Sequence, residues 1–391
     1  MARRPLRIGL NLLYLVSGAG GLGRYARELM RALRVVEPDI ELTAFVSAEL
    51  PPEVLAAPWA EGIEWVELPV TVTHGPPWNF VNTLGSQWAT MPWLAARRRL
   101  DVVHGLGNTA PLVSPRVATV VTVLDLIWMR HPQTMGRRAR IGMKVVTPLS
   151  ARRADRVIAI SDTVKQDLVN TLALPARKID AIPLGIRLDE LVAPTPEPAL
   201  RATLGIPEDR EVVLCVAQKR PHKNLTGLVR ALAQLPEPRP VLVLPGAPTH
   251  YEEQLRALAA HEGVVDDLRL PEWLSDADLE AAYGLAAAFV LPSFEEGFGL
   301  PILEAMRRDV PVACSRASAL EEVAGDAAEL FDPHDPTDIA RALRRLLADP
   351  ARRQELVMKG QARCANFTWE RTAAATVDVY RRAIAQRMGP G

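Results

Sequence analysis

Apolar runs of strand length alternate with amphipathic segments of helix length along this chain, and the alternation is interrupted once. Runs that fit buried strands in the first half lie at residues 7–12, 41–46, 102–104, 118–123 and 156–159, and helix-like segments include 24–34 and 163–172. In the second half, strand-like runs lie at 211–217, 241–244, 267–270 and 286–291, with helix-like segments at 225–235, 251–261 and 276–284. Alternation of this kind is typical of parallel sheets covered by helices. The sequence therefore predicts an α/β protein with two doubly wound domains.

The interruption between the two halves is rich in proline. Residues 192–198 are Val-Ala-Pro-Thr-Pro-Glu-Pro, which favours a stiff linker. A length of 391 residues is sufficient for two domains with separate cores. We therefore expect a first domain over residues 1–190, a linker over 191–200, a second domain over 201–367 and a helix in 368–391. Ligands of doubly wound sheets bind at the carboxyl ends of the strands, so we expect a ligand cleft between the two sheets.

The chain has no net charge, but its charges are divided unevenly. Residues 1–190 hold 23 Lys and Arg against 17 Asp and Glu, and the remaining residues hold 23 against 29. This asymmetry is not the footprint of a nucleic-acid-binding protein. A basic group in the first half fits either a solvated helix face or contact with an anionic membrane or polyanionic acceptor. It consists of Arg137, Arg138, Arg140, Lys144, Arg152 and Arg153.

Cysteine content and hydrophobic pattern favour a cytoplasmic location. The three cysteines, at positions 215, 314 and 364, lack metal-ligand spacing and indicate a reducing compartment. The apolar segments fall short of the ~20 residues that a membrane span needs. The basic and then apolar N-terminus could be a signal peptide, but Asn11 interrupts the apolar run and favours a first strand. We expect a cytoplasmic protein, with attachment to the inner face of a membrane left open.

The segment from Ser293 to Met306 carries the most chemical information. It follows the strand-like run 286–291 and contains Glu296 and Glu304, eight residues apart, with Pro301 suited to the first turn of a helix. The backbone N–H groups of Gly297, Phe298, Gly299 and Leu300 lie between the carboxylates and would form an anion site at a helix N-terminus. Carboxylates repel a phosphate unless they bind neutral hydroxyls. A nucleotide sugar supplies both groups, whereas an acidic loop that caps a helix is the simpler alternative.

This segment resembles the Glu-x7-Glu motif of the retaining glycosyltransferase family 4 (glycosyl transferases group 1). The stretches Pro311–Ser315, Glu322–Ala328, Phe331–Pro336 and Phe367–Glu370 resemble the segments that follow it in that family, in the same order. The resemblance implies the GT-B fold, in which two Rossmann-like domains face each other across a cleft and a C-terminal helix packs back on the first domain. It also implies that Glu304 binds the donor ribose and Glu296 the donor sugar. In the family, the leaving phosphate takes the acceptor proton, so we expect no separate protein base.

A basic turn at residues 217–224 resembles the family's Gly-Arg-x-x-Pro-x-Lys-Asn segment, whose cations bind the diphosphate. Lys223 matches the family's lysine, but Gln218 replaces its arginine. Arg220 lies two residues further on and could supply the missing charge, which a leaving diphosphate needs. We therefore expect Glu296, Lys223 and Arg220 to form the catalytic set, with Gln218 near the donor; a solvated basic turn is the alternative.

Three short segments in the first half belong to the same predicted cleft. Glycines in residues 17–23, of which Gly21 and Gly23 are the candidate donor ligands, would let backbone N–H groups approach a phosphate; a tight strand-to-helix turn is the alternative. Leu124 and Asp125 lie where the family usually has His-Asp at the donor sugar's outer edge, so Leu124 suggests a 6-deoxy sugar. His104 and Asn108 are candidates for the acceptor side, although a lone histidine is more often a structural residue with both nitrogens hydrogen-bonded.

The pattern predicts a transferase that uses no metal and no cofactor, with a nucleotide-diphosphate sugar as co-substrate. No His, Asp or Glu cluster in the sequence has metal-ligand spacing. The expected acceptor is a carbohydrate, a lipid-linked molecule or a small natural product, and not a nucleic acid. Two alternatives stay open: a GT-B nucleotide-sugar epimerase, and a catalytically silent subunit that binds a nucleotide sugar.

Overall fold

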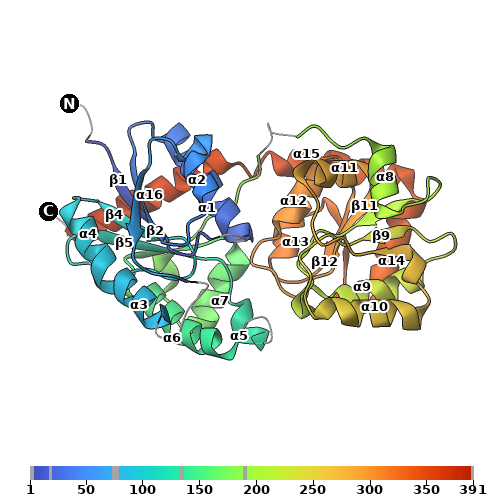
Figure 1. The fold of residues 1–391 in the computed structure, drawn as a ribbon, viewed down its shortest axis with the longest axis horizontal. Coiled ribbons are helices and arrows are strands. Elements are labelled where there is room, and N and C mark those ends of the chain that lie inside the picture. Colours follow the sequence, from blue (N-terminus) through green and yellow to red (C-terminus); the bar gives the residue numbers. More distant parts are fainter. Residues whose placement is uncertain (1–3, 17–19, 73–78, 133–135, 188–191, 389–391) are drawn as a thin grey trace. The chain divides into compact units, whose positions relative to one another are not determined.

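The computed structural model describes residues 4–16, 20–72, 79–132, 136–187 and 192–388, and the chain divides into two compact units. Unit 1 comprises residues 1–129, 137–185 and 369–391, and unit 2 comprises residues 130–136 and 186–368. Each unit is built around one parallel sheet with helices on both of its faces (Figure 1). Neither unit is therefore continuous in sequence: residues 130–136 belong to unit 2, and the C-terminal helix belongs to unit 1.

The sheet of unit 1 has seven strands in the order β3-β2-β1-β4-β5-β6-β7. The strands are β1 (Arg7–Leu12), β2 (Glu41–Ser47), β3 (Glu64–Leu68), β4 (Val102–Gly105), β5 (Ala118–Val123), β6 (Arg156–Ala159) and β7 (Ile179–Ala181). The helices of this part of the chain are α1 (Gly20–Val36), α2 (Pro52–Ala56), α3 (Asn79–Gly85), α4 (Met91–Arg97), α5 (Ile127–Arg130), α6 (Arg137–Arg153), α7 (Asp162–Leu172) and α16 (Trp369–Met388). The strand order changes direction between β1 and β4, which makes this pair the switch point of the sheet.

The sheet of unit 2 has six strands in the order β10-β9-β8-β11-β12-β13, with its switch point between β8 and β11. The strands are β8 (Val212–Leu214), β9 (Val241–Val243), β10 (Leu268–Arg269), β11 (Ala286–Leu291), β12 (Val312–Ser315) and β13 (Ala328–Phe331). The helices are α8 (Glu197–Leu204), α9 (Leu225–Ala233), α10 (Tyr251–Glu262), α11 (Asp276–Leu285), α12 (Leu300–Arg307), α13 (Ala319–Ala324), α14 (Pro336–Ala348) and α15 (Pro350–Cys364).

The central strands are apolar because both of their faces are covered. Every residue of β5 is buried, and so are the last four residues of β11, as expected for parallel strands between two layers of helices. Cys215 and Cys314 are fully buried among these apolar residues. The start of α7 is set by a side-chain cap, because Ser161 accepts a hydrogen bond from the Val164 N–H.

Three local features differ from the sequence-based prediction. The edge strands β3 and β7 were not predicted, because β3 contains two glutamates with only Leu68 buried and β7 has only three residues. Helix α1 begins at Gly20 and not after the glycines, so Gly21 and Gly23 lie in its first turn. Helix α8 begins at Glu197, inside the segment 191–200 that we expected to be a linker.

Helix α16 packs against α1 and the sheet of unit 1. In Figure 1 this red C-terminal helix lies beside the blue α1, and the two helices pack along each other. The rings of Tyr25 in α1 and Trp369 in α16 have centroids 6.1 Å apart, and Arg381 forms an ion pair of 2.7 Å with Glu37. The last helix of the chain therefore completes the core of the first unit.

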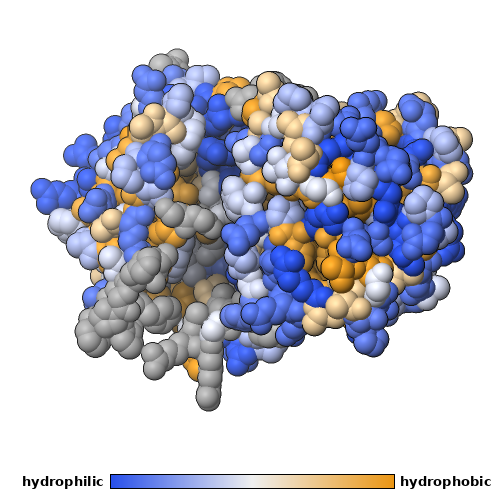
Figure 2. Space-filling view, turned by 45° about the vertical axis from the view of Figure 1, so that its right-hand side comes forward, coloured by the Kyte–Doolittle hydropathy of each residue, from blue (hydrophilic) through white to orange (hydrophobic). Residues whose placement is uncertain are grey.

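Hydrophilic side chains cover most of the face shown in Figure 2, and hydrophobic residues are gathered in smaller patches. Large exposed apolar side chains include Trp93 and Trp273. Among the described residues, the helices are all too short or too polar to cross a membrane.

Candidate active site

The carboxyl ends of β8 and β11 bring the strongest candidate residues of unit 2 together. These two strands are neighbours and flank the switch point of the sheet. The loop after β8 runs through Gln218, Arg220 and Lys223, and the loop after β11 runs through Glu296 to Gly299. Two segments about 75 residues apart in the chain therefore meet where doubly wound sheets bind ligands.

Glu296 and Lys223 are in direct contact at this point. The Lys223 Nζ donates to Glu296 Oε1 at 2.6 Å, and the Ser293 hydroxyl donates to the same oxygen at 2.7 Å. The Ser318 hydroxyl accepts a hydrogen bond from the Glu296 N–H. The lysine side chain is 17% exposed and the carboxylate 11%, so both groups are held in place and still reach solvent.

The start of α12 has the geometry expected of an anion-binding helix end. Gly299 has a φ of +101° and precedes the first turn, which contains Pro301. A side chain at Gly299 would meet Leu320 Cδ2 at 2.5 Å, so only glycine fits. Phe298 is buried, and its ring packs edge-on against Phe367. The main chain of this turn, and not the phenylalanine side chain, is therefore the group that can bind a ligand.

Glu304 lies in the second turn of α12 and is 6% exposed. Its Oε2 accepts a hydrogen bond from the Tyr283 hydroxyl at 3.1 Å. A carboxylate that is almost buried is stabilised when polar partners surround it. Glu304 is thus fixed in orientation, which suits a group that must recognise a diol.

Three neighbouring polar residues of the basic turn, at positions 218–220, have different environments. Gln218 is exposed and Arg220 is partly exposed. Lys219, in contrast, is fully buried: its Nζ forms an ion pair with Glu252 and donates to the Gly246 carbonyl, both at 2.8 Å. Lys219 is therefore a structural residue, which leaves Lys223 and Arg220 as the candidate diphosphate ligands of this turn.

Two groups beside this site were not predicted: the carboxylate of Glu295 and the imidazole of His222. Glu295 is buried and accepts a hydrogen bond from Arg130 at 2.7 Å, with His131 Nε2 at 3.2 Å. His222 is 6% exposed, and within the described part of the chain its Nδ1 has no hydrogen-bond partner. Burial, with Lys223 as a second cause, lowers the pKa of His222 to about 4. Sequence alone could not single out these residues, because each stands beside a stronger candidate, Glu296 or Lys223.

The glycine segment of unit 1 is described from Gly20 onwards, and its residues 17–19 lie outside the described residues. Gly21 is exposed, and a side chain at this position would meet no atom within 4 Å. Packing within unit 1 therefore does not require glycine at position 21. The absence of a side chain there, and at Gly23 in the same turn, leaves the backbone N–H groups open to close approach by a ligand.

The contacts of His104 bear on its two predicted alternatives, an acceptor-side role and a structural role. The residue is fully buried in β4, with its Nδ1 2.8 Å from the Tyr380 hydroxyl and its Nε2 2.8 Å from the Thr122 hydroxyl. Thr122 is in turn 3.0 Å from the Tyr25 hydroxyl. Burial lowers the pKa of His104 to about 3, so the ring is neutral. Of the two alternatives for His104, these contacts support the structural one, and sequence does not show that the Tyr380 and Thr122 hydroxyls lie against the two ring nitrogens.

Asn108, Leu124 and Asp125 form one local structure. Asn108 has a φ of +63°, and its Oδ1 accepts a hydrogen bond from the Leu124 N–H at 2.7 Å. The Asp125 carboxylate accepts one from the Ile127 N–H at 3.1 Å and so supports the start of α5. Leu124 is partly exposed. Asn108 and Asp125 thus hold the backbone around Leu124, and the roles of these three residues toward a substrate stay predictions.

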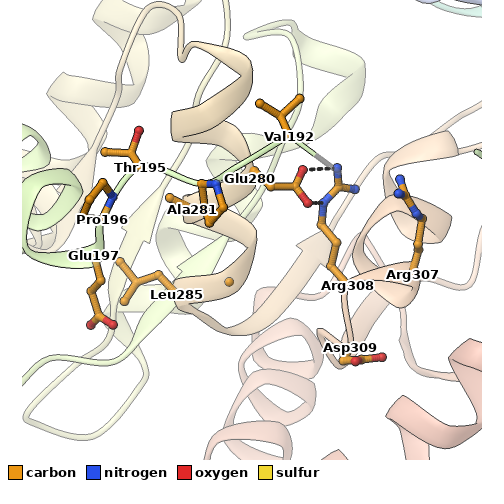
Figure 3. Close-up of a pocket in the computed structure, with 12 residues that line it drawn as sticks. Val192, Thr195, Pro196, Glu197, Glu280, Ala281, Leu285, Arg307, Arg308 and Asp309 are labelled. Atoms are coloured by element: carbon orange, nitrogen blue, oxygen red, sulfur yellow. Dashed lines mark hydrogen bonds and ion pairs between the residues drawn. The ribbon is translucent and has the colours of Figure 1, made fainter. Parts of the chain in front are cut away.

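None of the predicted site residues lines a pocket of about 480 Å³ in unit 2 (Figure 3). It is lined by α8 and α11 and by Arg307, Arg308 and Asp309 at the C-terminal end of α12. The candidate site lies at the N-terminal end of that helix. In the described residues, no group of three or more His, Cys, Asp or Glu side chains is arranged to hold a metal ion.

Comparison with known sequences identifies the family. The sequence model described as "Glycosyl transferases group 1" matches residues 196–363, and the model "Glycosyltransferase Family 4" matches residues 19–190. A D-inositol 3-phosphate glycosyltransferase from Kineococcus radiotolerans is 34% identical, over 94% of this chain and 92% of the relative. An MMP alpha-(1->4)-mannosyltransferase from Mycolicibacterium hassiacum is 30% identical, over 94% of this chain and 96% of the relative.

The chain belongs to glycosyltransferase family 4.

Solved structures confirm the predicted GT-B fold. Sucrose-phosphate synthase from Thermosynechococcus elongatus has a TM-score of 0.77 at 23% identity, with 97% of this chain and 100% of that chain covered. Alr3699/HepE from Anabaena, in complex with UDP-glucose, has a TM-score of 0.75 at 18% identity, with 96% and 99% covered. The two Rossmann-like sheets of this family 4 member are therefore the two domains of a GT-B glycosyltransferase.

Family membership also bears on the two alternative functions that the sequence left open, an epimerase and a silent subunit. A glycosyltransferase is supported along nearly the whole chain, whereas neither the epimerase nor the silent subunit finds support among the relatives named above. The basic group on α6 stays a prediction, since the side chains of Arg137 and Arg138 lie outside the described residues. Of the other members, Arg152 donates to the Leu172 carbonyl and so has a structural contact.

Proposed function

We propose that this family 4 enzyme is a retaining glycosyltransferase that uses a nucleotide-diphosphate sugar. It transfers a hexose or 6-deoxyhexose to a hydroxyl of a glycan, a lipid-linked molecule or a natural product. The observation that carries this proposal is the Lys223–Glu296 contact of 2.6 Å at the switch point, beside the nearly buried Glu304. Each part of such a donor has a matching group. The cation suits the diphosphate, the two carboxylates suit the sugar and the ribose, and the helix N-terminus suits the phosphate oxygens.

Each residue has one task in this proposal. Glu304 accepts hydrogen bonds from the ribose hydroxyls, and Glu296 accepts them from the donor sugar. The N–H groups of Gly297–Leu300, with Lys223 and Arg220, bind the diphosphate. Gly21 and Gly23 offer N–H groups to the same donor, and Gln218 lies beside it.

Bond changes in the transfer are balanced without a protein base. The bond between the sugar C1 and the diphosphate oxygen breaks, and the nucleoside diphosphate leaves with that electron pair. The acceptor oxygen forms a bond to C1 on the same face of the ring, and its proton goes to the leaving phosphate. Negative charge grows on the diphosphate as the bond breaks, so cations and N–H groups stabilise the transition state more than the ground state.

The donor is tested by a screen of nucleotide sugars. UDP-, GDP- and dTDP-linked hexoses and 6-deoxyhexoses are compared by thermal shift, and then by slow hydrolysis of each donor that binds. We expect stabilisation and hydrolysis with one base class. A protein that binds a donor but neither hydrolyses it nor transfers it to any acceptor would support the silent-subunit alternative.

The acceptor screen includes phosphorylated cyclitols, because several relatives are named D-inositol 3-phosphate glycosyltransferases. Free sugars, sugar phosphates and lipid-linked sugars form the other groups. The anomeric configuration of the product, read by NMR, tests retention: a product with the opposite configuration to the donor would contradict the mechanism proposed above.

Metal independence is the last part of the proposal. The diphosphate charge is neutralised by Lys223, Arg220 and backbone N–H groups, and so we expect full activity in EDTA. Activity lost in EDTA and restored by Mg²⁺ or Mn²⁺ would mean that a metal takes over part of that task.

A further inference from the structure

A row of three side chains lies behind the carboxylate of Glu304. The Tyr283 hydroxyl in α11 donates to Glu304 Oε2 at 3.1 Å. The Arg308 guanidinium lies over the Tyr283 ring, 4.5 Å from its centroid. Glu280, one turn before Tyr283, accepts hydrogen bonds from Arg308 Nε at 2.8 Å and Nη2 at 2.5 Å. Side-chain contacts thus run from Glu280 to Arg308, from Arg308 to Tyr283, and from Tyr283 to Glu304.

Tyr283 is fixed more firmly than a hydrogen bond alone would fix it. The residue is fully buried, and its ring stacks on Phe289 of β11 with centroids 5.9 Å apart and an interplanar angle of 26°. A phenol held by Phe289 on one side and Arg308 on another has little freedom to move. Its hydroxyl therefore marks a fixed point in unit 2 for the Glu304 carboxylate.

Arg308 is held from several directions as well. Besides the pair with Glu280 that Figure 3 shows, its Nη1 donates to the main-chain carbonyl of Glu304 at 3.0 Å. The ion pair is partly shielded, because the arginine side chain is 15% exposed and the glutamate 11%. A cation over an aromatic ring is attracted by its π-electrons, and it also makes a phenolic O–H a stronger donor through polarisation.

We propose that Tyr283, held by Arg308 and Glu280, is a positioning residue that orients Glu304 for the ribose of the donor. This inference rests on the proposed role of Glu304 as the ribose ligand. The last torsion of a glutamate side chain is broad, so an isolated carboxylate turns through many orientations. A carboxylate accepts about four hydrogen bonds, and accepting one from Tyr283 is compatible with accepting two from a diol. Fixing the carboxylate plane in advance lowers the entropic cost of binding.

Tyr283→Phe tests the inference through the ratio of two nucleotide affinities, which a change in protein stability does not alter. Affinities for UDP and GDP are measured by calorimetry, and for whichever binds, also for its 2′-deoxy form. In the wild type, loss of one ribose hydroxyl that faces a charged group should weaken binding by about tenfold or more. Tyr283→Phe should weaken the ribonucleotide about three- to tenfold and the 2′-deoxynucleotide less, so that the ratio of the two affinities falls.

The control is Tyr380→Phe in unit 1, which removes another fully buried hydroxyl, the one 2.8 Å from His104 Nδ1. Both variants should lose stability, but only Tyr283→Phe should change the affinity ratio. That ratio is measured within one folded variant, and so a general loss of stability leaves it unchanged. An unchanged ratio in Tyr283→Phe would overturn the proposed positioning role.

Glu304→Gln separates failure of this inference from failure of the proposed function. If Glu304→Gln lowers the affinity ratio and Tyr283→Phe does not, Glu304 binds the ribose without help from Tyr283. If neither variant changes the ratio, the assignment of Glu304 itself is wrong. Arg308→Gln should act in the same direction as Tyr283→Phe and more weakly, because it loosens the phenol and leaves its hydroxyl in place.

Discussion

The two sheets have the same strand order around the switch point, but their polar groups are of opposite kinds. In unit 2, the ends of β8 and β11 lead to the charged and partly exposed Lys223 and Glu296. In unit 1, the neighbouring strands β4 and β5 carry His104 and Thr122, which are neutral, fully buried and bonded to Tyr25 and Tyr380. One topology therefore carries two kinds of polar group: charged, partly exposed residues in unit 2, and neutral, buried residues that connect helices to the sheet in unit 1.

This contrast has an energetic reason. Lys223 and Glu296 are mostly buried, but each keeps some exposure and the two offset each other's desolvation by pairing. A fully buried imidazole is tolerated only when it is neutral and both nitrogens have partners. Substitutions at Lys223 should therefore affect turnover, and substitutions at His104 should affect stability. The predictions below test that separation.

Lys223→Ala should have the largest effect. Its charge is needed most when the diphosphate leaves, so we expect kcat to fall by a factor on the order of 10²–10³, as when one transition-state donor is removed. Under assay conditions the fraction of folded protein should stay close to that of the wild type, because the Glu296 carboxylate that loses the lysine keeps some exposure and its hydrogen bond from Ser293. Steady-state kinetics and thermal unfolding measure the two quantities.

The matched control is Lys359→Ala, which removes a lysine of unit 2 that pairs with Asp326 and Glu355 at the surface. It should leave both quantities nearly unchanged. A loss of stability in Lys223→Ala that accounts for its loss of activity would remove the distinction between the two sheets.

His104→Gln should have the opposite profile. At pH 7 we expect the free energy of unfolding to fall by ~1–3 kcal/mol, since a glutamine cannot satisfy both the Tyr380 and Thr122 hydroxyls with the same geometry. Activity per folded molecule at 20 °C should stay close to that of the wild type. Denaturant unfolding combined with active-site titration checks this prediction.

The stability difference between the wild type and His104→Gln should depend on pH. Because burial lowers the pKa of His104 from 6.5 to about 3, the unfolded state binds a proton between these values and the folded state does not. The wild type therefore keeps this stability above pH 6.5 and loses it as the pH falls toward 3. The difference between wild type and variant should shrink over that interval. A constant difference would show that the ring is not held neutral by burial.

The fold was predictable because its determinants are local. The run 286–291 is β11 and residues 225–233 lie in α9, since apolar strands and amphipathic helices are visible in the sequence. Glu296 and Lys223 were also identified from their segments, and the structure brings them to 2.6 Å. The partners of His104 were not predicted and Tyr283 was missed, because burial depends on contacts with residues far along the chain, such as Tyr380. Sequence identifies charged residues in a loop more readily than the partners of a buried polar group.

Arg220→Ala tests whether this arginine replaces the cation that Gln218 lacks. If it does, kcat should fall by an amount comparable to that for Lys223→Ala, because both cations would then stabilise the leaving diphosphate. Arg230→Ala is the control, since Arg230 is exposed on α9 of the same unit. Full activity of Arg220→Ala would exclude the compensation and leave the family assignment intact.

Leu124→His should have the smallest effect, and it concerns donor choice. Family 4 usually has a histidine at this position, near the outer edge of the donor sugar. Here a partly exposed leucine stands there, and its N–H donates to the Asn108 side-chain Oδ1 at 2.7 Å. A buried sugar hydroxyl that faces leucine loses hydrogen bonds at a cost of ~1–3 kcal/mol, whereas a methyl group gains about 0.8 kcal/mol by burial. The wild type should therefore prefer a 6-deoxy donor to its hydroxylated counterpart by roughly tenfold or more in kcat/KM.

Competition between each hydroxylated donor and its 6-deoxy form decides this prediction, with GDP-mannose and UDP-glucose as the hydroxylated donors. Leu124→His should shift the preference toward the hydroxylated donor, because an imidazole can donate to the 6-hydroxyl that leucine leaves unpaired. Leu124→Met is the control: it keeps an apolar side chain of similar volume and should preserve the preference. A wild type that uses the hydroxylated donor equally well would show that Leu124 does not contact the outer edge of the sugar. The comparison of the two sheets would then say nothing about donor choice.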